Sequence, residues 1–269
     1  MEKISVVIPA YNRESTLLRA VKSALSQTVP VHEILICDDG STDNSKKIIT
    51  ELNNPAVKWI DCGKNGMPSV PRNMGIKAAT GEWIAFLDSD DEWLPEKINL
   101  QLEALAKNKT EACSTNANRM VNEKNCGIYL SFLKEKITFF ALLPVNNIIC
   151  SSVLVRKKLL ERISFFPEGK EYKAIEDYAL WLRLSTQTDF SFLPEPLVNY
   201  YDNPQSSVRS NYSDVWDLRS VIFSGFTNWL EEKKVVLNDA QKKQLAFAVK
   251  EIETKGKTSL WEKVKQKLK

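Results

Sequence analysis

Residues 83–91 of this chain place an apolar run directly before a group of carboxylates. The apolar part, Trp83–Leu87, has the length of a buried β-strand, and Asp88, Asp90 and Asp91 follow it. Because open α/β sheets bind ligands beyond the carboxyl ends of their strands, this run predicts a strand that opens into a site. Asp88 and Asp90 stand two positions apart, so an extended backbone points both side chains to one face.

Two carboxylates on one face repel each other unless a positive charge lies between them. Oxygen ligands in this number suit Mg²⁺ or Mn²⁺, which take one or two protein carboxylates and complete their shell with water and phosphate oxygens. The plainer interpretation is a turn before a helix over Trp93–Lys107, with Asp91 as its cap. Taken alone, the motif favours the plainer interpretation.

Strands and helices alternate over the first 107 residues. Apolar, β-branched runs predict strands over Ile4–Ile8, Glu33–Cys37, Val57–Asp61 and Trp83–Leu87. Helices are expected over Leu17–Leu25 with Ser15 as cap, Asn44–Leu52 with Asp43 as cap, Pro71–Ala79 and Pro95–Lys107. This alternation is typical of a mostly parallel, doubly wound α/β sheet flanked by helices.

Three of the four strands end in polar clusters. These clusters are Tyr11–Asn12, Asp38–Asp39 and Asp88–Asp90. In a parallel sheet they converge on one pocket. Each has a structural explanation, since Asn12 can simply turn the chain and either acid of the second cluster can form an Asx turn. Their recurrence at equivalent strand ends favours a functional site.

Charge and cysteine content exclude several function classes. The net charge is +3, and residues 250–269, with seven Lys and three Glu, carry more than this excess. The remainder of the chain is therefore not charged like a nucleic-acid-binding protein. Five cysteines without a C-x-x-C pair indicate neither a zinc site nor a disulfide framework, so a reducing cytoplasm is the expected compartment.

Neither a leader peptide nor a membrane span is expected. Residues 1–9 lead directly into the first strand without the long apolar core of a leader. The most apolar later region, Ile137–Val155, is interrupted by Pro144, Asn146 and Asn147.

Four separated motifs together resemble family 2 of the inverting glycosyltransferases, which have the GT-A fold. The motifs are Val7–Asn12, Ile36–Asp43, Arg72–Gly75 and Gly81–Asp91, and they agree in order and spacing. The resemblance implies a GT-A catalytic domain over residues 1–210, with a nucleotide-sugar half over 1–115 and an acceptor half over 116–210. A C-terminal helical extension is expected over residues 211–269.

The resemblance also implies the residues that bind the nucleotide and the metal. Asp39 would accept the uracil N3 proton, which favours UDP, and Arg72 would lie near the base or diphosphate as a fixed cation. Asp90 would coordinate Mn²⁺ or Mg²⁺ as part of the Asp-x-Asp motif. The remaining nucleotide-binding residues would be Pro9, Ala10, Tyr11 and Asn12 at the base and ribose, and Asp88 and Ser89 at the ribose.

The acceptor half is expected to supply a base. Residues 174–184 predict a helix with Glu176 and Asp177 in its first turn, where the helix dipole alone explains them. In the family, an acidic pair opening such a helix deprotonates the acceptor hydroxyl, so Asp177 is the expected base, with Glu176 second. Strands are expected around it at Cys150–Val155, Phe190–Leu193 and Val198–Tyr201.

Two features near the C-terminus leave alternatives open. Family members often carry a His shortly after residue 201, but this chain has none there, and Arg209 is its expected substitute. Near the end, Leu260, Trp261, Val264 and Leu268 recur at helical spacing among lysines. A helix lying on an anionic membrane surface and a solvated or frayed terminus explain this tail equally well.

The expected function is metal-dependent, inverting transfer of a hexose or N-acetylhexosamine from a UDP-sugar. The acceptor would be a glycan or lipid-linked glycan in surface-polysaccharide (O-antigen, capsule or lipooligosaccharide) synthesis. The enzyme would work in the cytoplasm, on the inner face of the membrane if the tail binds there.

Two other function classes agree less well with the sequence. A sugar-phosphate nucleotidyltransferase would be expected to carry a Gly-rich basic loop after its first strand. The segment at that place in this chain, Pro9–Asn12, is not such a loop. A catalytically silent sugar-nucleotide or glycan-binding module would be expected to lose the carboxylates that are present here.

Overall fold

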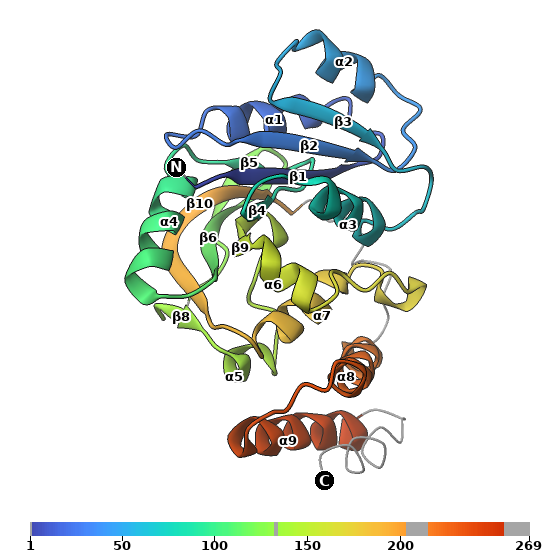
Figure 1. The fold of residues 1–269 in the computed structure, drawn as a ribbon, viewed down its shortest axis with the longest axis vertical. Coiled ribbons are helices and arrows are strands. Elements are labelled where there is room, and N and C mark those ends of the chain that lie inside the picture. Colours follow the sequence, from blue (N-terminus) through green and yellow to red (C-terminus); the bar gives the residue numbers. More distant parts are fainter. Residues whose placement is uncertain (1, 132–133, 203–214, 256–269) are drawn as a thin grey trace.

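The computed structural model describes residues 2–131, 134–202 and 215–255 (Figure 1). The predicted roles of Arg209 and of the basic tail from residue 257 therefore fall outside the described residues. No helix in the described ranges is both long and apolar enough to cross a membrane.

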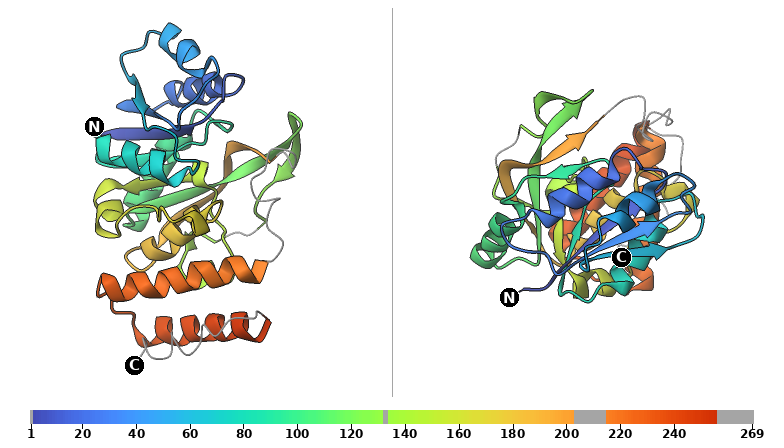
Figure 2. Two further views of the ribbon diagram at one scale, coloured as in Figure 1. Left: turned by 90° about the vertical axis from the view of Figure 1, so that its right-hand side faces the viewer. Right: turned by 90° about the horizontal axis from the view of Figure 1, so that it is seen from above.

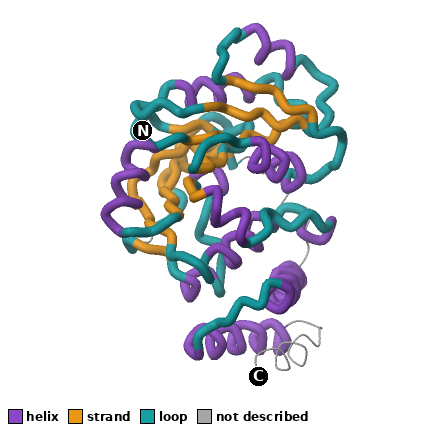
Figure 3. The backbone as a smooth tube through the Cα atoms, viewed as in Figure 1, coloured by secondary structure: helices purple, strands orange, loops and turns teal. Residues whose placement is uncertain are grey.

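Ten strands of the described chain form one mixed sheet, shown in orange in Figure 3. Their order is β3-β2-β1-β4-β9-β6-β10-β5, with β7 beside β6 and β8 beside β10. The strands are β1 (Ile4–Ala10), β2 (Glu33–Asp38), β3 (Val57–Asp61), β4 (Trp83–Phe86), β5 (Glu92–Trp93), β6 (Ala112–Val121), β7 (Lys124–Ile128), β8 (Lys136–Ile137), β9 (Leu154–Arg156) and β10 (Phe190–Tyr201).

Parallel pairing dominates the centre of this sheet. Strand β1 pairs in parallel with β2 and β4, β2 pairs in parallel with β3, and β6 pairs in parallel with β10. Strand β9 lies antiparallel between β4 and β6. The prediction of a mostly parallel α/β sheet is therefore confirmed, and the polar ends of β1, β2 and β4 lie at one edge.

Helices cover both faces of the sheet. They are α1 (Leu17–Leu25), α2 (Ser45–Glu51), α3 (Ser69–Ala78), α4 (Lys97–Asn108), α5 (Phe139–Leu142), α6 (Lys157–Arg162), α7 (Glu176–Leu184), α8 (Val215–Glu232) and α9 (Asp239–Lys255), with 3₁₀ turns η1 (Cys150–Ser152) and η2 (Lys170–Tyr172). Because side chains alternate along β1, Val6 and Ile8 pack with α1 and α4, whereas Val7 packs with α3 and α7.

Helix α3 lies unusually close to the sheet at Gly75. A Cβ there would stand 2.6 Å from the Cys37 sulfur and 2.7 Å from Val7 Cγ1, closer than real Cβ contacts. Glycine thus allows the approach that brings Arg72, one turn earlier on α3, against the carboxyl edge of the sheet.

Helices α8 and α9 stack beneath α7, as the left view of Figure 2 shows. Phe223, Phe226 and Trp229 of α8 are buried in the same apolar cluster as Trp181 of α7. Trp229 Nε1 also donates a hydrogen bond to the Ile163 carbonyl at 3.0 Å. The predicted helical extension thus shares its core with the sheet domain.

One predicted helix start and the predicted helix caps were wrong. Helix α3 begins at Ser69, with Pro68 at the N-cap, rather than at Pro71. The first-turn amides of a helix lack intrahelical partners, so Pro71 is tolerated inside that turn. At α1 the N-cap is Thr16, not Ser15, and it makes no side-chain capping bond. At α2 the N-cap is Asn44 rather than the predicted Asp43, although Asp43 Oδ1 accepts from the Ser45 amide at 3.0 Å just before the helix.

Three further local predictions were wrong because tertiary contacts outweighed local pattern. Glu92–Trp93 pairs with β10 as a strand, so α4 begins only at Lys97 and Asp91 is not its cap. Residues Cys150–Ser152 form a 3₁₀ turn before β9 rather than a strand. The two predicted strands after residue 189 form one strand, β10, with irregular pairing around Pro196.

Candidate active site

Asp88 is held by two contacts where β4 leaves the sheet. Its amide donates to Ser151 Oγ at 3.0 Å, and its Oδ1 accepts from Arg72 Nη2 at 2.6 Å. About a quarter of the side chain is exposed. The sequence predicted Asp88 here, but Ser151, which lies in the 3₁₀ turn η1, gave no sequence signal.

Asp90 lies at the rim of the same edge. Its Oδ2 stands 3.6 Å from Arg13 Nη2, and 37% of its side chain is exposed. Burial and the neighbouring Asp88 carboxylate raise the pKa of Asp90, while Arg13 opposes the shift. Ionising Asp90 therefore costs free energy that a further cation would return.

The donor set around Asp90 fits Mn²⁺ or Mg²⁺. Across the described ranges, no group of three or more His, Cys, Asp or Glu side chains converges as a complete metal cage. Asp88 and Asp90 offer only carboxylate oxygens, and burial together with the Asp88 carboxylate raises the pKa of Asp90. Such a site suits a hard cation that takes its remaining ligands from a diphosphate and water.

The predicted nucleotide loop after β1 is tied to the loop after β2. Asn12 has a left-handed backbone, with φ of 51°, and its amide donates to Ser41 Oγ at 2.9 Å. Its side-chain oxygen accepts from the Thr42 amide at 2.8 Å. Pro9 and Ala10 are buried in β1, whereas 43% of Tyr11 is exposed, so Tyr11 presents an open aromatic surface.

Asp39 is buried and organises a loop over the end of β2. Its Oδ1 accepts from the Asn65 amide at 2.7 Å and from Asn65 Nδ2 at 3.1 Å, and its Oδ2 accepts from the Gly66 amide at 2.8 Å. Each carboxylate oxygen can accept two hydrogen bonds. Among the described residues, Oδ2 accepts from the Gly66 amide, so it can accept a second hydrogen bond. The predicted contact from uracil N3–H could be made there.

Arg72 joins the two halves of the site. It is 5% exposed and donates to Asp88 Oδ1 at 2.6 Å and to Glu176 Oε1 at 2.8 Å. Its guanidinium carbon lies 5.4 Å from the Phe166 ring centroid, which limits its movement. The structure therefore places Arg72 between two carboxylates of different elements, a position that sequence spacing could not give.

The two acids that open α7 have different partners. Glu176 Oε1 binds Arg72, while its Oε2 is buried without a hydrogen-bond partner among the described residues. Burial raises the pKa of Glu176, Arg72 lowers it and Asp177 raises it. Asp177 accepts instead from neutral groups, the Tyr178 amide at 2.6 Å and Asn146 Nδ2 at 3.2 Å.

Sequence reasoning placed the acids but missed their supports. Ser89, which was predicted to contact the ribose, is buried within the loop between Asp88 and Asp90. Arg13 had one signal, since it directly follows the predicted loop at Asn12. Asn146 and Ser151 had none, because Asn146 lies in a segment without periodic pattern and Ser151 lies where the sequence predicted a strand instead of the observed 3₁₀ turn.

Comparisons with known proteins identify the family. The model of Glycosyl transferase family 2 matches residues 5–164. Two Escherichia coli proteins, WfgD and WfaP, are each named UDP-Glc:alpha-D-GlcNAc-diphosphoundecaprenol beta-1,3-glucosyltransferase. WfgD is 32% identical over 209 residues, which cover 77% of this chain and 80% of WfgD. WfaP is 35% identical over 214 residues, which cover 78% of this chain and 81% of WfaP.

A solved structure supports the fold. The crystal structure of S. aureus TarS 1-349 in complex with UDP-GlcNAc matches with a TM-score of 0.72 at 23% identity, covering 92% of this chain and 71% of that one. At this identity the likeness establishes the GT-A architecture only. Together with the family match, these findings show that the chain belongs to glycosyl transferase family 2 and is a glycosyltransferase of the GT-A fold.

Proposed function

We propose that this glycosyltransferase moves a hexose from a UDP-sugar to a lipid-linked glycan acceptor, with inversion and with a divalent metal. The observation that carries the proposal is the Arg72 bridge, which brings Asp88 beside the acids that open α7. A transferase needs its donor leaving group and its acceptor base at one such junction.

The donor end of the site is assigned to the carboxyl edge of β1, β2 and β4. Asp39 receives the uracil N3 proton, Tyr11 and Asn12 flank the base and ribose, and Asp88 with Ser89 holds the ribose. Asp90 holds the metal, and Mn²⁺ or Mg²⁺ bound there would stabilise negative charge on the departing diphosphate. Arg72 keeps Asp88 in place through their 2.6 Å contact.

The base is assigned to Asp177. Glu176 has one oxygen bound to the Arg72 guanidinium, which fixes it as an orienting group. Asp177 accepts hydrogen bonds from Asn146 Nδ2 and from the Tyr178 amide. It sits in the first turn of α7, where the helix dipole favours an ionised carboxylate that can accept the acceptor hydroxyl proton.

The first substrates to test follow from the names of the relatives. WfgD and WfaP are named for transfer from UDP-glucose to GlcNAc linked to diphosphoundecaprenol. We assign this chain the same substrate class, with UDP-glucose as the first donor and a lipid-diphosphate-linked GlcNAc as the first acceptor. A role in surface-polysaccharide synthesis follows from such an acceptor, and the enzyme would meet it at the cytoplasmic face of the inner membrane.

A transfer assay tests the proposal. Purified protein is incubated with a lipid-diphosphate-linked GlcNAc and each of several UDP-hexoses and UDP-N-acetylhexosamines, with Mn²⁺ or with EDTA. We expect one UDP-sugar to give product only with metal, and the new linkage to be β when the donor is α. A retained α linkage would contradict inversion, and transfer in EDTA would contradict the metal assignment.

The same assay separates the silent-module alternative. If UDP binds in calorimetry but no donor reacts with any acceptor, the catalytic assignment fails and a sugar-nucleotide-binding module is favoured.

A further inference from the structure

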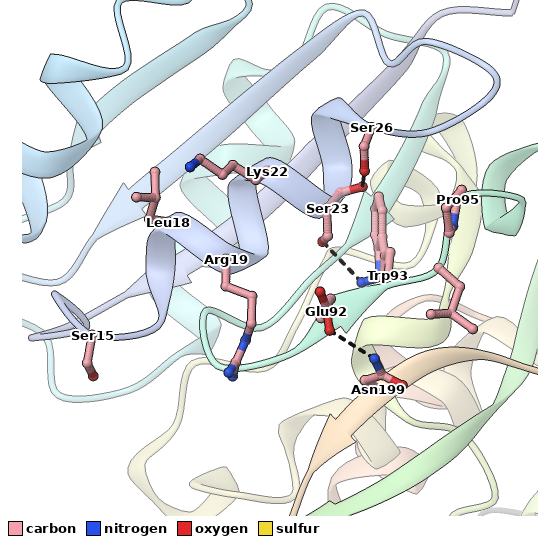
Figure 4. A pocket seen from close by; sticks show the side chains of 11 residues that line it. Ser15, Leu18, Arg19, Lys22, Ser23, Ser26, Glu92, Trp93, Pro95 and Asn199 are labelled. Carbon is pink, nitrogen blue, oxygen red and sulfur yellow. Dashed lines mark hydrogen bonds between the residues drawn. The ribbon is translucent and has the colours of Figure 1, made fainter. Parts of the chain in front are cut away.

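A second arginine holds the carboxylate loop from the opposite face of the sheet. Arg19 extends from α1 and donates from Nη2 to the backbone carbonyl of Asp90 at 2.8 Å. Helices α1 and α3 pack on different faces of the sheet, so Arg19 and Arg72 reach residues 88–90 from opposite sides. Figure 4 shows Arg19 at the edge of a pocket between α1 and β5.

Tyr201 at the end of β10 fixes the Arg19 side chain. The guanidinium carbon of Arg19 lies 3.7 Å from the centroid of the Tyr201 ring, a close cation–π contact. The Tyr201 amide donates to Asp91 Oδ1 at 2.9 Å. A continuous path of contacts therefore leaves the loop at the Asp90 carbonyl, passes through Arg19 and Tyr201, and returns at Asp91.

Asp91 is buried and connects Tyr201 to Ser151. It is 1% exposed, and its Oδ2 accepts a hydrogen bond from the Ser151 hydroxyl. Ser151 in turn accepts from the Asp88 amide at 3.0 Å. The peptide group before Asp88 is thus held through Ser151, and the peptide group after Asp90 is held through Arg19, so both ends of residues 88–90 are fixed.

We infer that Arg19 and Tyr201 are positioning residues that fix the Asp90 peptide and so hold the Asp90 carboxylate ready for a divalent cation. The inference rests on the proposed function, because it takes Asp90 as the metal ligand. Without these contacts the backbone at Asp90 would sample several conformations in the unbound protein. Metal binding would then have to order the loop again.

Electrostatics alone predicts the opposite sign. Arg19 is a cation beside a cation site, so its removal would tighten metal binding if charge were its main contribution. Positioning predicts that its removal weakens binding. Lys22, three residues along α1 and on the rim of the same pocket, is an exposed cation whose side chain makes no hydrogen bond or ion pair with the described residues, and it serves as the charge-matched control.

The experiment measures Mn²⁺ affinity directly, by the electron paramagnetic resonance signal of free Mn²⁺ in the presence of UDP. For Arg19→Ala we expect the Mn²⁺ dissociation constant to rise about tenfold, the equivalent of one lost backbone restraint. Arg19→Lys keeps the charge but loses the planar fork, and we expect it to weaken Mn²⁺ binding in the same direction by less. Tyr201→Leu removes the ring contact and should also weaken binding, while Lys22→Ala should leave it unchanged.

Two results would overturn the inference. If Arg19→Ala binds Mn²⁺ as tightly as the wild type, or more tightly, Arg19 does not position Asp90. If Lys22→Ala weakens binding as much as Arg19→Ala, the effect belongs to general charge on α1. Should Arg19→Ala not fold, the Mn²⁺ affinities of Arg19→Lys and Lys22→Ala are compared instead. Weaker binding in Arg19→Lys alone supports the inference, and equal affinities overturn it.

Failure of the proposed function would look different. In that case the wild-type protein itself would bind UDP without any dependence on Mn²⁺, before any variant was compared.

Discussion

Glu33, at the amino-terminal end of β2, is surrounded by donors, whereas Asp90 and Glu176 at the carboxyl edge lie among other carboxylates. Ser5, Thr80 and Lys58 all donate to Glu33 at 2.7 Å. Burial opposes its charge, but these hydrogen bonds lower the pKa of Glu33 to about 2.

At the carboxyl edge the balance is reversed. Burial raises the pKa of both Asp90 and Glu176, and a neighbouring carboxylate adds to each shift. The two edges are built from the same sheet, so the difference is not one of fold. Donors of the protein itself stabilise the carboxylate at the amino-terminal edge, and under the proposed function a bound cation would do so at the carboxyl edge.

The largest effect is expected from Asp177→Asn. If Asp177 is the base, transfer should fall roughly 10³-fold, because an amide cannot accept the acceptor proton. UDP affinity should stay nearly unchanged, since the amide keeps the size of the side chain and a hydrogen-bond acceptor. Initial rates and UDP calorimetry measure the two quantities on the same preparation, and an equal loss of both would refute the base assignment.

Arg72→Lys should break the junction between the two halves of the site. A lysine has a single ammonium group and cannot reproduce the two guanidinium nitrogens that bind Glu176 and Asp88 at the same time. We expect kcat/KM to fall roughly 10²-fold and the free energy of unfolding to fall by about 3 kcal/mol, since one buried carboxylate loses its partner. Arg156→Lys, at a partly exposed ion pair with Glu82, is the matched control. Full activity in Arg72→Lys would show that charge alone is sufficient.

Glu33→Gln should affect stability without affecting catalysis. Losing the ion pair with Lys58 and the charge-assisted bond from Ser5 should lower the free energy of unfolding by roughly 2–4 kcal/mol near pH 7. Denaturant titration measures this loss, and steady-state kinetics under native conditions should not change. A change in KM for the donor would contradict the separation of the two edges.

The same variant has a predictable pH dependence. The pKa of Glu33 lies near 4.5 in the unfolded chain and is lowered to about 2 in the fold, so its stabilisation is complete above pH 4.5 and is lost as the pH falls toward 2. The stability difference between wild type and Glu33→Gln should therefore shrink over that interval.

Lys97 provides a smaller effect in a higher pH range. It is fully buried, donates to Gln101 Oε1 at 2.7 Å and lies 4.2 Å from the Trp93 ring centroid. Burial lowers its pKa from 10.5 to about 7, so the unfolded chain binds more protons between these values and stability should rise with pH. From pH 7 to pH 9 we expect a gain of about 2 kcal/mol in wild type that Lys97→Met lacks. An identical slope in both proteins would show that Lys97 is not the source.

The sequence predicted the carboxyl edge better than its supports. Residues such as Asp88 and Asp90 could be placed because a strand pattern fixes where its end lies, and parallel strands end together. The partners Asn146, Ser151 and Arg19 could not, because each comes from a distant segment and only tertiary packing brings it to the loop. Asp91 shows the same limit, since its cap-like position in sequence concealed a buried side chain that binds Ser151 and the Tyr201 amide.

Under the proposed function, the carboxylates at the carboxyl edge lower the free energy of unfolding of the free protein, and the binding of UDP and metal raises it. Calorimetric unfolding of wild type and Asp90→Asn, each with and without UDP and Mn²⁺, tests it most directly. We predict that Asp90→Asn is at least as stable as wild type without ligand, because the substitution removes a carboxylate beside Asp88. We also predict that it loses the rise in melting temperature that ligands give the wild type. A free Asp90→Asn protein that is clearly less stable, or one that keeps the full ligand-induced rise, would contradict the account.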